Sequence, residues 1–235
     1  MILEVCCGNL ESVKGAIEGG ADRIELCRDL DLDGLTPNRE MIRDAVRLCR
    51  PAGVAVHVLI RSREGDFVYT DAEVEQMADE IRMAVAEGVD GVVVGALTVD
   101  GDIDVDACRQ WVKAVGRIGG HSCRNITFHR AFDVCRQPLE AMEQIAQMGC
   151  NRILTSGQQP TAEAGIPLLR QMVEKAHELS AKMGRAFTIL CGAGVNTENA
   201  FRILKATGAT EIHGSLRTGL VSDAEKIRRA KQQNP

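Results

Sequence analysis

The sequence has little proline, no low-complexity tract and no change in composition that would indicate a linker. Six prolines are scattered over 235 residues, 45% of which are hydrophobic and 26% charged, the balance of a globular protein. Every apolar run stays short of the roughly 18 residues that a transmembrane helix needs. We therefore expect one soluble domain over residues 1–235, with no membrane partner.

The sequence also lacks clusters of basic residues and paired cysteine motifs, and we expect no signal peptide. The formal net charge is −5 and the Lys and Arg residues are scattered, which argues against a nucleic acid partner. The nine cysteines are odd in number and include no C-x-x-C, and no signal peptide precedes Met1. We expect free thiols in a reducing cytoplasm. The oligomeric state stays open, a homo-oligomer included.

What the sequence does contain is an alternation of short β-branched, apolar runs with longer helical patterns. This alternation is typical of right-handed βαβ units and hence of a parallel sheet. Eight units in this length predict an α/β protein with a single closed (β/α)8 TIM barrel. The expected strands are centred on residues 2–6, 23–27, 54–60, 91–96, 126–131, 152–156, 187–192 and 211–217.

A turn that recurs before every second strand supports closure of the barrel. Gly20, Gly88, Gly149 and Gly208 each end an expected helix, and a small polar residue follows two positions later. The glycine supplies a left-handed C-cap, and the polar side chain can bond to the backbone of the turn. Such turns lie at the floor of a barrel, so they predict fold and not chemistry.

Alternation along the strands predicts which side chains face the barrel axis. The predicted inward set is polar, whereas barrel interiors normally fill with Val, Ile and Leu. Burying charges is costly unless they are paired or meet a ligand, so a functional mouth explains the set better than a buried salt-bridge network, which remains the alternative. The inward residues are Glu4, Cys6, Glu25, Cys27, His57, Arg61, Thr127, His129, His213, Ser215 and Arg217.

Two strand ends carry further candidate ligand-binding residues. The turn "GAGVNTEN" contains Gly192 and Gly194 and runs into a helix, so its backbone N–H groups can hold a phosphate or carboxylate. An ordinary tight turn fits this stretch equally well. Ser156 ends the sixth expected strand, in "RILTSG", and is a further candidate.

Two loops are open to more than one interpretation. The loop 61–70 is long and carries Arg61 and Arg63, which suits a polar lid over the barrel mouth, and a merely solvated loop fits as well. Residues 29–40 match the calcium-loop pattern D-x-D-x-D-G-x5-E. A strand, however, enters this stretch where a calcium loop follows a helix, so we interpret it as a solvated acidic loop.

Cys6 and Cys27 differ from the other cysteines because they end adjacent strands on the same face. Two thiolates in this position can share one soft ion. They suit Cu(I), since a structural zinc site would need four ligands. His129 or His57 can supply a third ligand.

The motifs together resemble the CutC family of copper homeostasis proteins. The similar stretches are "LEVC", "GGADRIELC" followed by "GLTP", "TFHRAFD", "RILTSG" and "HGS-x-R", in this order over about residues 2 to 217. The resemblance implies a TIM barrel and a cytoplasmic role in copper homeostasis. It also implies Cu(I) binding by Cys6 and Cys27, with His129 in the family's polar pocket.

The inward residues also fit a second function, that of a barrel enzyme. Its acid-base chemistry would act on a small polar, phosphorylated or sugar-like metabolite, and whether the protein is an enzyme stays open. The catalytic candidates are Glu4, Glu25, His129 and Asp133, the last of which can fix the His129 ring or a neighbouring Arg. The ligand-binding candidates are His57, Arg61, Arg63, Ser156, Gly192, Gly194, Ser215 and Arg217.

Overall fold

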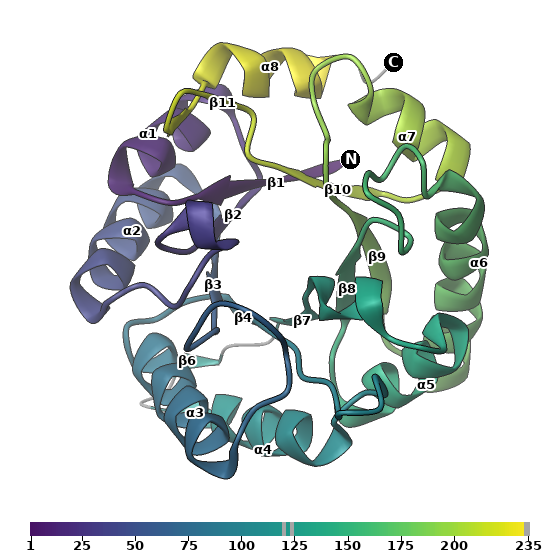
Figure 1. The fold of residues 1–235 in the computed structure, drawn as a ribbon. Coiled ribbons are helices and arrows are strands. Elements are labelled where there is room, and N and C mark those ends of the chain that lie inside the picture. Colours follow the sequence, from purple (N-terminus) through teal and green to yellow (C-terminus); the bar gives the residue numbers. More distant parts are fainter. Residues whose placement is uncertain (119–120, 123–124, 233–235) are drawn as a thin grey trace.

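Eight parallel strands close into a barrel, and helices surround it (Figure 1). The computed structural model describes residues 1–118, 121–122 and 125–232, so Cys123 and the last three residues lie outside the described residues. The predicted (β/α)8 TIM barrel is confirmed. Its strands are β1 (Ile2–Cys7), β2 (Arg23–Leu26), β3 (Ala55–Leu59), β4 (Gly91–Val94), β7 (Asn125–Phe128), β8 (Arg152–Thr155), β9 (Thr188–Cys191) and β10 (Glu211–Gly214).

The helices cover the outer face of the barrel, and the main apolar core lies between the two layers. Leu3 and Val5 of β1 are fully buried there, as strand alternation predicts. Thr70 and Glu73 form a capping box at the start of the third helix. The helices are α1 (Leu10–Gly19), α2 (Arg39–Ala52), α3 (Asp71–Ala86), α4 (Val105–Val115), α5 (Pro138–Met148), α6 (Ile166–Met183), α7 (Ala200–Thr207) and α8 (Ala224–Gln232).

The repeated glycine turns have the predicted conformation. Gly20 ends α1 with φ of 80°, in the left-handed region. The polar residue that follows bonds to a neighbouring strand: Asp22 accepts from the N–H of Leu3, and Asp90 accepts from the N–H of Val56, each at 2.8 Å. These turns therefore fasten adjacent strands together at the floor of the barrel.

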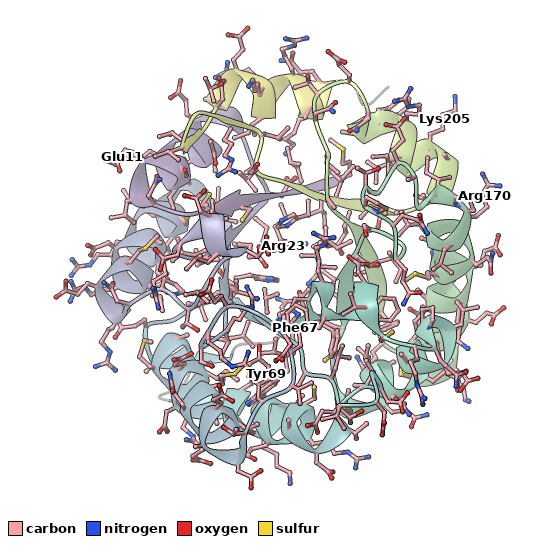
Figure 2. All side chains as sticks on the ribbon, viewed as in Figure 1. Glu11, Arg23, Phe67, Tyr69, Arg170 and Lys205 are labelled. Atoms are coloured by element: carbon pink, nitrogen blue, oxygen red, sulfur yellow. The ribbon has the colours of Figure 1, made fainter. Side chains whose placement is uncertain are left out.

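A buried ion-pair network lies inside the barrel near the N-terminal ends of the strands. Glu4 of β1 lies beside Arg23 of β2 and pairs with it, and Arg23 Nη2 also donates to Glu211 at 2.6 Å. Arg152 of β8 donates to the same carboxylate, from Nε at 2.6 Å. In Figure 2 the Arg23 side chain lies inside the ring of strands. The alternative of a salt-bridge network is thus correct for this level of the barrel.

Short elements interrupt the regular alternation. The predicted strand 211–217 ends at Gly214, and the chain then forms an antiparallel hairpin from β11 (Arg217–Thr218) and β12 (Val221–Ser222). Arg217 is consequently exposed and does not face the barrel axis as predicted. The other short elements are the hairpin β5 (Arg117–Ile118) and β6 (His121–Ser122) and the 3₁₀ helices η1 (Leu30–Leu32) and η2 (Arg130–Val134).

Candidate functional site

A cavity of about 350 Å³ opens at the C-terminal ends of the strands. This is the end of a (β/α)8 barrel at which enzymes of this fold bind their substrates. The acidic segment 29–40 contributes Leu30 and Asp33 to its wall. The predicted inward or catalytic residues that line the cavity are Cys6, Glu25, Arg61, His129, Asp133 and His213.

Cys6 and Cys27 form a pair of thiols at the wall of the barrel interior. Their Sγ atoms lie 3.8 Å apart, and the residues are 8% and 1% exposed. Both pack with Leu59 and Val93 in a small apolar cluster that is separate from the main core. The hydrogen bond with Cys27 and burial raise the pKa of the Cys6 thiol well above its usual value.

His213 of β10 brings a nitrogen ligand close to Cys6, in a group that does not include Cys27. One ligand atom each from Cys6, Glu25 and His213 lies within 4.8 Å of the other two, the group among the described residues that can hold a metal ion. Nδ1 of His213 lies 2.8 Å from Glu4 Oε1, and Nε2 lies 3.7 Å from Glu25 Oε2. Alternation placed His213 inward, but neither the ligand nor the catalytic candidates included it.

The two glutamates near His213 have opposite pKa shifts. Burial raises the pKa of Glu25. Burial acts in the same direction on Glu4, but Arg23 and His213 outweigh it and hold the pKa of Glu4 well below its usual value. Burial would lower the pKa of His213, yet its hydrogen bonds to Cys6 and Glu4 raise it well above normal. Glu4 is therefore an ionised member of the ion-pair network at the barrel floor. Its contact with His213, which lines the cavity, connects this network to the cavity.

His129 follows β7 and carries an unused hydrogen-bond donor. Its Nδ1 accepts from the N–H of Ala131 at 3.1 Å and caps η2, so this tautomer has its proton on Nε2. Nε2 is buried and has no hydrogen-bond partner in the described part of the chain. Burial and, secondly, the charge of Arg61 lower the pKa of His129 to about 3, so the ring is neutral.

Arg61 follows β3 and is a buried cation, 4% exposed. Its guanidinium donates to the carbonyl oxygens of Leu32, Gly34 and Gly65. Phe67 lies against it, with the guanidinium carbon 5.3 Å from the ring centroid. Within the described ranges, no carboxylate lies close enough to form an ion pair with Arg61.

Asp133 fixes the loop after β8 and does not bond to His129. Its carboxylate accepts from the hydroxyl of Thr155 at 2.5 Å and from the N–H of Ser156 at 3.0 Å. Arg130 Nε also donates to it, at 2.8 Å. Of the two roles predicted for Asp133, the contact with a neighbouring Arg is the one that the structure contains.

Several predicted ligand-binding residues lie away from the cavity lining. Arg63 pairs with Asp66 and Glu73 and holds its own loop together. His57 lies below the cavity, with Nδ1 3.7 Å from Glu4, and burial lowers its pKa to about 3. The other candidates outside the lining are Ser156, Gly192, Gly194, Ser215 and Arg217.

The fold and the cavity define a (β/α)8 barrel protein with a candidate metal-binding group of Cys6, Glu25 and His213 at the C-terminal ends of its strands. The CutC family model matches residues 1–218. This chain belongs to the CutC family.

Named relatives agree with this assignment. A CutC family protein of Pasteurella multocida is 43% identical over 213 residues, or 91% of this chain and 81% of that protein. One from Bacteroides fragilis is 46% identical over 227 residues, or 95% of this chain and 83% of that protein.

Solved structures extend the comparison to the fold. CutC from Streptococcus agalactiae, whose name assigns it to copper homeostasis, has a TM-score of 0.82 at 31% identity and covers 92% of this chain and 98% of its own. Thiamine phosphate pyrophosphorylase from Pyrococcus furiosus has a TM-score of 0.64 at 18% identity, covers 98% and 94% of the two chains, and shows the fold alone. Among the described residues, no helix has the length and apolar character to span a bilayer.

Proposed function

We propose that this protein binds Cu(I) in the cytoplasm and serves copper homeostasis, with Cys6 and Cys27 as the soft ligands. The observation that carries the proposal is the Sγ–Sγ distance of 3.8 Å. Two sulfurs that each lie about 2.3 Å from one ion, the distance known for Zn–S, can be at most about 4.6 Å apart. The thiol pair meets this limit without a change in the backbone.

His213 is the third ligand in this proposal, in the place for which the sequence suggested His129 or His57. Its ring forms a close group with Cys6 and Glu25 that does not include Cys27, so the Cys27 side chain would have to turn toward the ion. Glu4 accepts from Nδ1 of His213, so Nε2 is the ring nitrogen that would bind a metal once its proton is displaced. Metal-binding histidines commonly donate their other ring N–H to a carboxylate in this way. Since 3.8 Å is shorter than the limit for two sulfurs on opposite sides of an ion, the distance favours a bent site with room for a further ligand.

Two further findings support the proposal. The described cysteines are all free and buried, which suits a reducing compartment. The Streptococcus agalactiae relative carries copper homeostasis in its name and matches nearly the whole chain.

A competition titration against a Cu(I) chelator under reducing conditions tests the proposal. We expect one tight Cu(I) site in the wild type and none when Cys6→Ser is combined with Cys27→Ser. Cys49→Ser and Cys108→Ser are the matched controls, because both thiols are fully buried outside the thiol pair and should leave the titration unchanged. A double variant that competes as well as the wild type would show that the two thiols are packing residues.

A further inference from the structure

The cavity contains a positive charge that no carboxylate of the described residues neutralises. Arg61 is 4% exposed, and its guanidinium donates to three carbonyl oxygens, which carry no net charge. A buried ion is stable only when it is paired or well solvated by hydrogen bonds, and a guanidinium is the side chain best suited to a planar carboxylate. Copper binding at the thiol pair gives Arg61 no role.

A second unsatisfied group lines the same cavity. Nε2–H of His129 is a buried donor without a partner in the described part of the chain, and an orphaned donor of this kind costs stability unless a ligand accepts from it. Phe67 contacts both groups, because its ring centroid lies 5.1 Å from that of His129 and 5.3 Å from the Arg61 guanidinium. Figure 2 shows Phe67 on the inner side of the surrounding helices. The Arg61 cation and the neutral N–H donor of His129 therefore both lie against the apolar ring of Phe67.

The acidic residues of the lining do not satisfy Arg61. The Asp133 carboxylate already accepts hydrogen bonds from Arg130, Thr155 and Ser156. Glu25 lies beside His213, and Asp33 is exposed on the loop after η1. Each is farther from the Arg61 guanidinium than an ion pair allows, so the charge remains available to an incoming anion.

We infer that the barrel mouth binds a small organic monocarboxylate, whose carboxylate group is held by Arg61 and His129. One unpaired cation next to one neutral donor balances a single negative charge, which a carboxylate carries and a phosphate dianion exceeds. The cavity, of about 350 Å³, has the size of a small-metabolite pocket, and Leu59, Phe67 and Leu154 give it apolar walls for the body of the molecule. This site lies beside the thiol pair and does not depend on it.

Isothermal titration calorimetry on the metal-free, reduced protein tests the inference. The probes are short monocarboxylates from acetate and lactate to benzoate, each measured beside its neutral amide, so that charge is the difference within each pair. We expect at least one carboxylate to bind while its amide does not. His129→Asn should weaken that binding about tenfold or more, because Asn retains the capping acceptor for η2 but cannot reach the position of Nε2.

Arg61→Met should have a still larger effect, and Arg63→Met is its control. Arg63 lies in the same loop and packs on Tyr69 at 5.1 Å, but Asp66 and Glu73 neutralise it and it does not line the cavity. If Arg61→Met does not fold, His129→Asn decides alone. Equal binding of acids and amides, binding of inorganic phosphate alone, or undiminished affinity in His129→Asn would overturn the inference. Cys27→Ser removes a proposed copper ligand that does not line the cavity and should keep its carboxylate binding, so failure of the copper proposal would be recognised separately.

Discussion

The two levels of the barrel interior should respond differently to loss of a carboxylate. Glu211 pairs with both Arg23 and Arg152, whose side chains are 6% and 8% exposed. Glu211→Gln removes the negative charge between two buried guanidiniums, which should cost about 3–5 kcal/mol of unfolding free energy. With a urea m-value of about 2 kcal/mol/M, the midpoint should fall by roughly 2 M.

Glu25→Gln is the matched perturbation at the upper level. Glu25 is as buried as Glu211, but its nearest cation is His213 at 3.7 Å and burial raises its pKa. Loss of its charge should therefore change stability by no more than about 1 kcal/mol. Urea unfolding followed by circular dichroism and by the fluorescence of Trp111, the one tryptophan, measures both variants. Equal losses in the two variants would refute the division into a structural floor and a ligand-binding mouth.

Three further outcomes follow from the described contacts. His57 and His129 have folded pKa values of about 3, so below about pH 6.5 the unfolded state gains protons that the folded state does not. The free energy of unfolding should therefore fall by roughly 1.5 kcal/mol per histidine from pH 6.5 to 5. Urea midpoints measured over this range should show about half the wild-type loss in His129→Asn. Cu(I) affinity should rise with pH in chelator competition, because a metal must displace a proton from Cys6, whose pKa the contact with Cys27 and burial raise, and from His213, whose pKa its hydrogen bonds raise. A pH-independent constant would exclude these ligands. Gly95→Ala would place a Cβ 2.6 Å from the His129 ring, which would have to move. The variant should therefore lose carboxylate binding in calorimetry, and unchanged binding would mean that the His129 ring does not contact the carboxylate.

Alternation in the sequence predicted the direction of side chains but not their depth along the barrel. Glu4 and Glu25 were both predicted to face inward, and both do, yet one is paired with Arg23 in the floor and the other lines the cavity. Depth depends on how far neighbouring strands are staggered, and a pattern of period two contains no information about that stagger. The same pattern extended back by two residues from Glu25 and from His213 would have found Arg23 and Glu211.

Residues beyond the strand ends were the least predictable. Arg217 was assigned to the cavity because the strand was extended to residue 217, whereas the chain leaves the barrel after Gly214 and forms the hairpin β11–β12. The sequence placed Arg61 among the inward residues and Arg63 only in the loop, but it made both candidates for ligand binding. Loop contacts show that Arg63 is paired with carboxylates and that Arg61 bonds to carbonyl oxygens. Such contacts arise from tertiary structure, since loop backbone follows no periodic pattern.

The ion pairs at the barrel floor also help to specify how the barrel closes. A shift of two residues between β1 and β2 would keep every apolar side chain on the helix side, so hydrophobic burial does not discriminate against it. The same shift would replace the Glu4–Arg23 neighbours by Glu4 opposite Glu25, or by Cys6 opposite Arg23. Either arrangement leaves buried charges uncompensated, which makes the misaligned barrel costly. The buried charges thus help to determine the register of the strands, because they destabilise alternative closures of the barrel that its apolar residues alone would permit.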